Sequence, residues 1–492
     1  MTNDPSASSQ RFSASGDASS TEGAARPPEQ GVPASGVPER RLSLVDCTSI
    51  IVGIIIGSGI YRSMPDVAGS LTAEWQLPAI WILGGLFALV GSLCYAELAT
   101  RMPVEGGDYA YLGAAFGRPV GFLFAWTQLW VIRPGSIGAL ACVFAAYAAE
   151  LKPLGSASFL IYGCGSVVLL TVINALGVKL GTTTQNILTG AKVIGLAAVI
   201  VAGIMTRPHV AESTTAAVSR SWGGAFDALS FAMIFVLFAY SGWNEMGCVA
   251  AEVREPRKNI LRALLLGAAV VAVIYVGLNW ACARVLGLAA MATSKAVATD
   301  AVKPLLGDWG GRAIALLICV SALGSTNGMI FTGARIYYAM GSRHRGLGLL
   351  ARWHAGLGTP VVSLVAQMLI TLALLIAFGM TADVGSAGDA FERLVIFMTP
   401  PFYLFLILSA LAVIVLRRRE KPEASSASDG VFRMPLFPWP AIIVAAASAF
   451  MIYKGVMYIM FKYDASTLWA AVWVAATLVS GVVYIATVER AK

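Results

Sequence analysis

Long apolar stretches recur along the whole chain, and this pattern restricts it to a bundle of membrane-spanning helices. About 20 apolar residues are enough for one helix to cross a bilayer. Hydrophobic residues make up 57% of the 492 residues and charged residues only 13%, which excludes a soluble globular fold. We predict an all-α membrane protein with twelve transmembrane helices, at roughly 44–68, 78–100, 119–149, 157–177, 184–205, 226–251, 262–287, 312–341, 360–379, 391–416, 440–460 and 466–487.

The ends of the chain and its charges indicate how it lies in the membrane. Residues 1–42 are rich in Ser, Ala, Gly and Pro, and we predict a disordered tail before a twelve-helix domain at 43–490. The tail lacks the apolar core of a signal peptide. Lys and Arg cluster in the loops on the side of the tail, Arg417 to Arg419 for example. On the other side, 288–311 is predicted to be a long outer loop. The positive-inside rule then predicts a multi-pass protein of the cell membrane with both termini cytoplasmic.

Two of the twelve spans are interrupted by small and polar residues. In span 1, Gly53 and Gly57 form a GxxxG pattern that helix packing alone would explain, but packing does not explain Ser58-Gly59. In span 6, the run 240–244 (YSGWN) interrupts a second apolar stretch. The two spans lie five apart and so cross the membrane in opposite directions. Paired interruptions of this kind indicate an inverted-repeat transporter whose broken helices line the binding site.

The chemistry of a broken helix indicates the kind of substrate. N–H groups at the start of a half-helix carry partial positive charge and bind an anion such as a carboxylate. Freed carbonyl groups nearby bind an ammonium group. An α-amino acid carries both groups, so we predict an amino acid site at the two interruptions.

Several segments resemble one family of transporters. The segments are IIIGSGIY (54–61), GGDYAYLGAAFG (106–117), VIRPGSIGAL (131–140), TTTQNILTGAKVIGL (182–196), FAYSGWNEMGCVAAEVREPRKNI (238–260) and SALGSTNGMIFTGARIYYAMGSRHRGL (321–347). Together they resemble the amino acid–polyamine–organocation (APC) superfamily, and within it the L-type amino acid transporter branch. The resemblance implies a five-plus-five inverted repeat at about 44–205 and 226–416, with discontinuous helices 1 and 6 and peripheral helices 11 and 12 at about 440–487.

The resemblance also implies positions for the substrate. The carboxylate would lie on the backbone N–H groups of Gly57, Ser58 and Gly59. The ammonium group would lie on carbonyl groups near Ile55 in span 1 and near Phe238 and Ser241 in span 6. Phe238 matches an aromatic gate on the outer side of the substrate, and Asn244 matches a polar residue near the site.

Lys192 in span 5 is a charge inside an apolar stretch. Such an ammonium group costs about 2.5–3.5 kcal/mol on insertion scales. One interpretation is that it snorkels to the cytoplasmic edge. The resemblance implies another, in which Lys192 replaces the sodium ion of related transporters and bridges span 5 to carbonyls near Gly53 and to Ser321. For Arg133 and Glu245, the other charges inside the membrane, we predict a structural role such as a buried pair or helix bracing.

Two departures from the animal members concern the substrate and the partner. Pro400-Pro401 in span 10 is unexpected in a segment that shapes the side-chain pocket. The loop AELKPLGSAS (149–158) has no cysteine, so no disulfide-linked heavy-chain subunit is expected. The seven cysteines lie within or beside apolar spans without metal-ligand spacing, and neither a metal site nor a cofactor is predicted.

These observations predict a transporter and not an enzyme, since no set of residues for covalent chemistry is present. We predict alternating-access transport of neutral L-amino acids, with sodium-independent exchange (antiport) favoured. Proton-coupled symport is the alternative mechanism. An amino acid sensor with a transporter-like fold is the alternative of another class.

Overall fold

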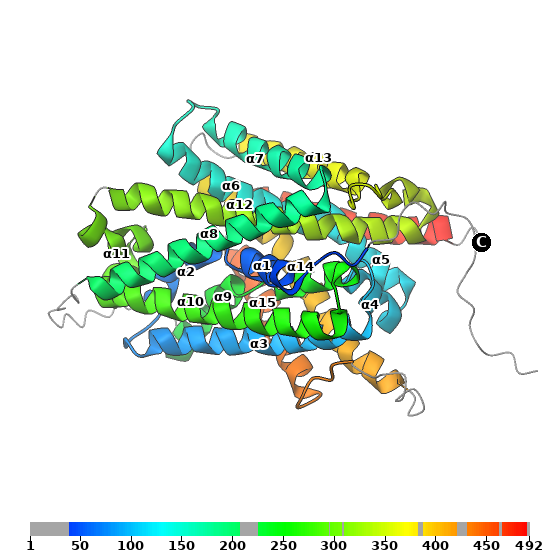
Figure 1. Ribbon diagram of the computed structural model, residues 1–492, viewed down its shortest axis with the longest axis horizontal. Helices are drawn as coiled ribbons and strands as arrows, with labels where there is room; N and C mark the ends of the chain where they lie inside the picture. Colours follow the sequence, from blue (N-terminus) through cyan, green and yellow to red (C-terminus); the bar gives the residue numbers. More distant parts are fainter. Residues whose placement is uncertain are drawn as a thin grey trace, which may run out of the picture. The chain divides into compact units, whose positions relative to one another are not determined.

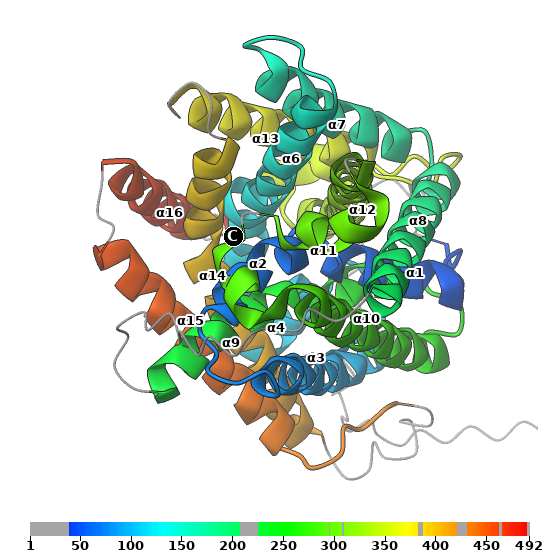
Figure 2. The ribbon, with the colours of Figure 1, turned by 90° about the vertical axis from the view of Figure 1, so that its left-hand side faces the viewer.

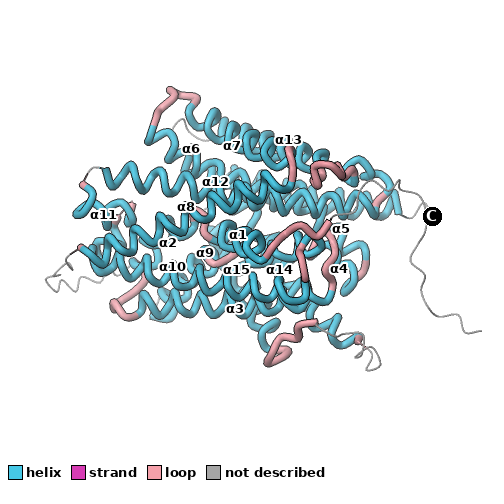
Figure 3. The backbone as a smooth tube through the Cα atoms, in the orientation of Figure 1, coloured by secondary structure: helices cyan, strands magenta, loops and turns pink. Residues whose placement is uncertain are grey.

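The computed structural model describes residues 39–206, 225–294, 296–307, 309–381, 387–420, 431–461 and 465–489. The predicted tail at 1–42 therefore lies outside the described residues up to position 38. Within the described part the protein consists of helices and loops without a strand (Figure 3). The first five predicted spans correspond to α1 (Leu44–Ile55) with α2 (Gly59–Ala68), α3 (Gln76–Arg101), α5 (Arg118–Thr127) with η1 (Gln128–Ile132) and α6 (Arg133–Leu151), α7 (Ser158–Ala175), and α8 (Val178–Met205).

The second half repeats this order of elements, again beginning with a broken helix. It consists of α9 (Ala225–Ala239) with η2 (Trp243–Glu252), α10 (Pro256–Thr293), α12 (Trp309–Arg343), α13 (Val361–Thr381) and α14 (Ala387–Arg419). The chain continues with α15 (Trp439–Phe461), α16 (Ala465–Tyr484) and η5 (Ile485–Glu489). Short elements lie in the connections, namely α4 (Asp108–Phe116), α11 (Val297–Leu306) and η3 (Arg345–Ala351).

The helices are long and apolar enough for a multi-pass membrane protein. Nine helices of the described residues meet the length and hydropathy of a membrane span, and the bent pair α1–α2 makes up to ten. The two other predicted spans correspond to α13, in which the apolar helix Val361–Ala377 is shorter than a span, and to α9 with η2, which are two separate short helices. A helical membrane protein is therefore confirmed, whereas the number twelve and the division into two repeats stay predictions.

The broken helices lie in the centre of the bundle. In Figure 1, α1 and α2 lie between α8 and α12 on one side and α10 on the other, and Figure 2 shows α1 between α8 and α10. Contacts of α1 with α8, α10 and α12, and of α2 with α9 and α10, give the same arrangement. Helices α15 and α16 lie at one edge, where they pack on α14. The breaks are thus enclosed by unbroken helices on several sides.

The prediction that 288–311 is a loop is wrong for most of its length. The segment continues α10 to Thr293 and then forms α11, which contacts α10 and α12. Val297, Ala298, Ala301 and Val302 are buried. Their spacing places them on one face of a helix, and burial of that face against neighbouring helices stabilises a segment that is too short to stand alone.

Candidate functional site

The break in span 1 exposes three backbone donors. Helix α1 ends at Ile55, α2 begins at Gly59, and the two are bent by 46°. Among the described residues, the N–H groups of Ser58, Gly59 and Ile60 make no backbone hydrogen bond. These are the donors that the first turn of any helix leaves without an intrahelical partner. They carry the positive end of the α2 dipole and suit an anionic group.

The glycines of span 1 differ in the space around them. A Cβ on Gly53 would overlap the side chains of Gln185 and Thr189 in α8, so Gly53 permits close helix packing. A Cβ on Gly59 would lie 3.4 Å from the Cα of Ala239 and 3.5 Å from the Phe238 ring. These are ordinary contact distances, so the packing around Gly59 does not require a glycine. The packing interpretation holds for Gly53 but does not account for Gly59.

The break in span 6 lies against the break in span 1. Gly242 has φ +120°, which side chains rarely allow, and a Cβ there would lie 3.0 Å from Ile54 and 3.3 Å from Ile55. At the end of α9, the carbonyl of Phe238 accepts hydrogen bonds from the N–H group of Ser241 (3.1 Å) and from its hydroxyl (2.7 Å). Carbonyl groups of span 6 thus meet span 1 at the middle of the bundle.

Tyr275 of α10, which the sequence analysis did not identify, joins the two breaks. Its hydroxyl lies 2.9 Å from the carbonyl oxygen of Ile55 and 3.2 Å from that of Ala239. The ring is fully buried. The only signal in the sequence is one tyrosine within an aliphatic stretch, and its partners lie far away along the chain.

Tyr275→Phe should weaken substrate binding more than folding. The variant removes one buried hydroxyl and leaves two carbonyl oxygens without that donor, a loss of roughly 1 kcal/mol or more. We expect the apparent KM for amino acid uptake to rise by about three- to tenfold. Tyr240→Phe is the control, because Tyr240 belongs to the span 6 break but its hydroxyl donates to the Trp81 carbonyl in α3 (2.9 Å) and not to a carbonyl of α1 or α9. Equal KM values in both variants would contradict a role at the breaks.

Lys192 occupies the carbonyl end of α1. Its Nζ atom lies 2.8 Å from the carbonyl oxygens of Gly53 and Ile56 and 3.0 Å from that of Ser321 in α12. The side chain is 0% exposed, so it does not snorkel to an edge. The three N–H donors of an ammonium group match the three carbonyl acceptors. Gly324 makes room for it, since a Cβ there would lie 2.8 Å from Nζ.

Two serines of α12 complete this group of contacts. Ser321 Oγ donates to the Ile56 carbonyl at 2.9 Å, and Ser325 Oγ donates to the Gly53 carbonyl at 2.8 Å. The sequence analysis named Ser321 but not Ser325, although one helical turn separates them. Together with Lys192 they bind the freed carbonyls of α1 to α8 and α12.

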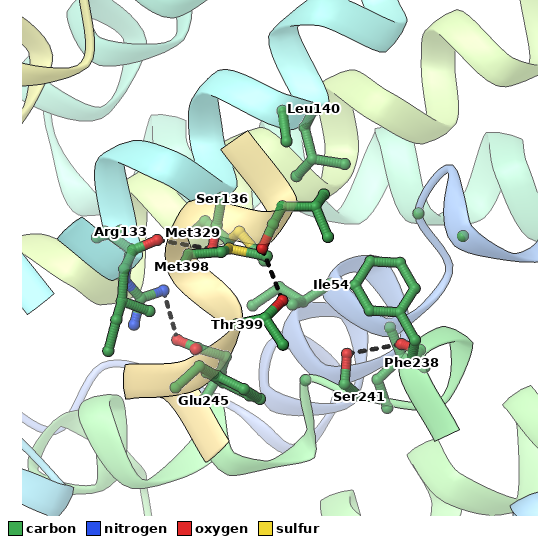
Figure 4. A pocket seen from close by; sticks show the side chains of 18 of the residues that line it. Ile54, Arg133, Ser136, Leu140, Phe238, Ser241, Glu245, Met329, Met398 and Thr399 are labelled. Atoms are coloured by element: carbon green, nitrogen blue, oxygen red, sulfur yellow. Dashed lines mark hydrogen bonds and ion pairs between the residues drawn. The ribbon is translucent and has the colours of Figure 1, made fainter. Parts of the chain in front are cut away.

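A cavity of about 100 Å³ lies where the two breaks meet (Figure 4). Its wall includes all seven residues that the sequence analysis assigned to the substrate, namely Ile55, Gly57, Ser58, Gly59, Phe238, Ser241 and Asn244. The residues assigned to the sodium-like position, Gly53, Lys192 and Ser321, lie beside it and not in its wall. From α14, Met398, Thr399, Phe402 and Tyr403 complete the wall, and Pro400-Pro401 lies among them within a continuous helix.

The chain was compared with known proteins. A sequence model of the amino acid permease family matches residues 42–484. The chain belongs to this family. The serine/threonine exchanger SteT of Bacillus subtilis is 30% identical over 419 residues, which cover 84% of this chain and 90% of SteT. The b(0,+)-type amino acid transporter 1 of Mus musculus is 30% identical over 424 residues, 84% of this chain and 82% of the relative. The mouse Asc-type amino acid transporter 1 is 31% identical over 391 residues, 77% and 71% of the two chains.

Membership of this family identifies the class of protein to which the site belongs. This permease is an amino acid transporter with the APC fold and not an enzyme. The resemblance found in the sequence is confirmed. The assignment of individual residues to the substrate rests on the geometry above and stays a proposal.

Buried ion pairs attach the second half of span 6 to its neighbours in this permease. The pair predicted for Arg133 and Glu245 is confirmed, at 2.8 Å, and Thr332 of α12 bonds to both partners. Further along η2, Glu252 accepts two hydrogen bonds from Arg335 of α12, at 2.7 and 3.1 Å. The ten residues of η2 form a 3₁₀ helix, which is uncommonly long for that geometry and typical of a functional hinge.

Two further acidic residues, Glu97 and Glu255, differ in their surroundings. Glu97 is buried, lies 2.9 Å from Arg101 and 3.6 Å from Arg417, and accepts the backbone N–H group of Met434. Glu255 lies 3.4 Å from Lys258, and both are exposed. An exposed pair of this kind contributes little, so Glu97 and Glu252 are the better candidates for a gate.

Proposed function

We propose that this permease is a sodium-independent exchanger of small neutral L-amino acids that works by alternating access. The observation that carries the proposal is the Lys192 ammonium group on three carbonyl oxygens at the end of α1. Unwound carbonyls in broken transporter helices are where a coupling cation binds. Here a fixed cation already holds that position, 2.8–3.0 Å from its acceptors, and a free sodium ion is not needed.

The backbone of the two breaks would hold the amino acid by its two charged groups. The carboxylate would accept hydrogen bonds from the N–H groups of Ser58, Gly59 and Ile60, which have no backbone partner among the described residues. The ammonium group would donate to the carbonyl of Phe238. That carbonyl already accepts two bonds from Ser241, so we infer that the Ser241 hydroxyl rotates away and the ammonium group replaces it.

Exchange is favoured over ion-coupled uptake because no coupling ion would bind together with the amino acid. The names of the relatives include an exchanger and transporters of amino acids, SteT and the b(0,+)- and Asc-type proteins. We infer that the pairs Arg133–Glu245 and Glu252–Arg335 must separate when the second half of span 6 moves. Bound substrate would compensate for their loss, so the carrier would change its orientation while loaded.

Proton-coupled symport is the second candidate, and Asp108 is the observation that favours it. This residue begins α4, outside the membrane-spanning helices. Its carboxylate accepts hydrogen bonds from the hydroxyl groups of Tyr95 and Ser409, each at 2.7 Å. Burial raises the pKa of Asp108 to about 7, although both hydrogen bonds oppose the rise. Arg133 and Glu245 are the charged groups near it. A group with this pKa gains a proton as the pH falls through 7, as a proton carrier must.

We also propose that this permease lies in the cell membrane with both termini cytoplasmic and without a disulfide-linked subunit. The basic loops of the sequence support the orientation. The segment between α6 and α7, residues 152–157, contains no cysteine.

Replacing sodium with choline should leave transport unchanged. Purified protein in liposomes, loaded with unlabelled amino acid, should take up labelled L-amino acid at the same rate in either salt, because Lys192 replaces the ion. Uptake that stops in choline would contradict this. Uptake into empty liposomes under a pH gradient, lost in Asp108→Asn, would instead establish the symport mechanism.

A further inference from the structure

The cavity has a polar end that no residue of the proposed backbone site occupies. Figure 4 shows Arg133 and Glu245 on one side of the cavity, with Phe238 and Ser241 on the other. Gln128 lines the cavity as well. An amino acid whose charged groups lie on the two breaks would therefore extend its side chain towards this polar end.

Two polar atoms at this end are buried without a hydrogen-bond partner. They are the Oε1 atom of Gln128 and the Nε atom of Arg133, and their side chains are only 4% and 3% exposed. Most buried polar atoms in proteins have a partner, so each such atom requires an explanation. One is an acceptor and the other is a donor. A ligand in the cavity that can both donate and accept would satisfy both.

The local backbone places these two residues on the cavity. Residues 128–132 form a single π-helical turn, η1, directly before Arg133-Pro134. Pro134 has no N–H group to donate to the Trp130 carbonyl, which instead accepts the indole N–H of Trp473 at 3.3 Å. A π turn inserts one extra residue and changes which side chains face the interior, and such turns are frequent at functional sites.

The charges at this end exclude most classes of side chain. Arg133 and Glu245 form a 2.8 Å pair, so their charges balance each other and leave no net counter-charge for a cationic or an anionic side chain. An aliphatic side chain would leave both unpartnered atoms as they are. A long side chain does not suit a cavity of about 100 Å³.

We propose that Gln128 and Arg133 select a short substrate side chain with a hydroxyl or carboxamide group, serine and threonine before alanine and valine. A hydroxyl would donate to Gln128 Oε1 and accept from Arg133 Nε. This inference rests on the proposed function, because it uses the same cavity and the same orientation of the amino acid.

Threonine and valine test it best, because they have nearly the same shape and differ in one hydroxyl. Threonine and valine are each added as an inhibitor of the exchange of labelled L-serine in liposomes. The ratio of their two inhibition constants is measured. We expect threonine to bind at least about tenfold more tightly, since sites that bond a substrate hydroxyl reject the analogue without it. Gln128→Met keeps the length of the side chain and removes the acceptor, so the ratio should fall to about threefold or less.

Gln367→Met is the matched control. Gln367 is 1% exposed, and its Oε1 atom is also without a partner, but it does not line the cavity. Its variant should keep the ratio of the wild type. Arg133→Lys, which keeps the charge opposite Glu245 without the Nε donor, should lower the ratio as Gln128→Met does.

The outcomes separate this inference from the proposed function. If labelled amino acid is exchanged but the wild type binds valine as tightly as threonine, the selection by Gln128 and Arg133 is wrong while the transporter stands. If Gln128→Met and Gln367→Met change the ratio equally, the effect comes from packing, and the inference is again wrong. If no amino acid is exchanged by the wild type, the proposed function itself fails. Because the wild-type ratio needs no variant, the test remains valid even if Gln128→Met does not fold.

Discussion

Lys192→Ala should reduce exchange by at least about tenfold while the purified protein remains monodisperse. The variant removes the ammonium group from three carbonyl oxygens, and buried polar groups that lose a partner cost roughly 1–3 kcal/mol each. This is enough to shift a balanced equilibrium between inward-open and outward-open states by tenfold, since about 1.4 kcal/mol corresponds to that factor. Exchange by reconstituted protein and its elution on size exclusion are the measurements.

Two further variants define the role of this lysine. Lys192→Arg should rescue poorly, because a planar guanidinium is larger and does not place three donors around one atom. Lys179→Ala is the control, since Lys179 is exposed near the start of the same helix, α8, and should exchange as the wild type does. If Lys192→Ala also exchanges at the wild-type rate, the side chain has no part in the cycle.

Gly59→Leu should abolish amino acid binding while the protein still inserts into the membrane. A Cβ atom would fit at contact distance, 3.4 Å from the Cα of Ala239 and 3.5 Å from the Phe238 ring, but Gly59 lines the cavity, and the larger side chain of leucine would occupy it. There it would cover the N–H groups that we assign to the carboxylate. Binding of labelled amino acid to the purified variant, measured directly, is the test.

A matched glycine separates this effect from a general cost of leucine in a helix. Gly165 of α7 has no atom within 4 Å of its ideal Cβ position. Gly165→Leu should therefore bind amino acid as the wild type does. If Gly59→Leu binds amino acid as tightly as Gly165→Leu does, the substrate does not lie on the break of span 1. Gly59 would then have a role in packing only.

The candidate site could be proposed from the sequence because membrane depth and helix breaks are local properties. Gly-Ser-Gly at 57–59 and Ser-Gly at 241–242 interrupt apolar stretches, and no partner needs to be known to recognise them. Both then lie around one cavity. Lys192 was recognisable for the same reason, since a charge within an apolar stretch requires a partner wherever the fold provides one.

The parts that could not be predicted depend on contacts between distant segments. Tyr275 and Ser325 are ordinary residues until the fold brings them to the carbonyls of α1. In the π turn at 128–132, the Trp130 carbonyl that Pro134 leaves free accepts a hydrogen bond from Trp473, more than 300 residues later. Helix α11 was read as a loop because its ten residues gain stability only from the helices they contact.

The most direct measurement of the central claim is the release of labelled L-serine from liposomes that contain the purified protein, in choline buffer. Unlabelled L-serine outside should trigger release, whereas ethanolamine, which has no carboxylate, and lactate, which has no ammonium group, should not. This result would mean that the two breaks bind both charged groups of the amino acid and that Lys192 replaces the ion. Release that is equally fast with buffer, ethanolamine or lactate outside would contradict the account.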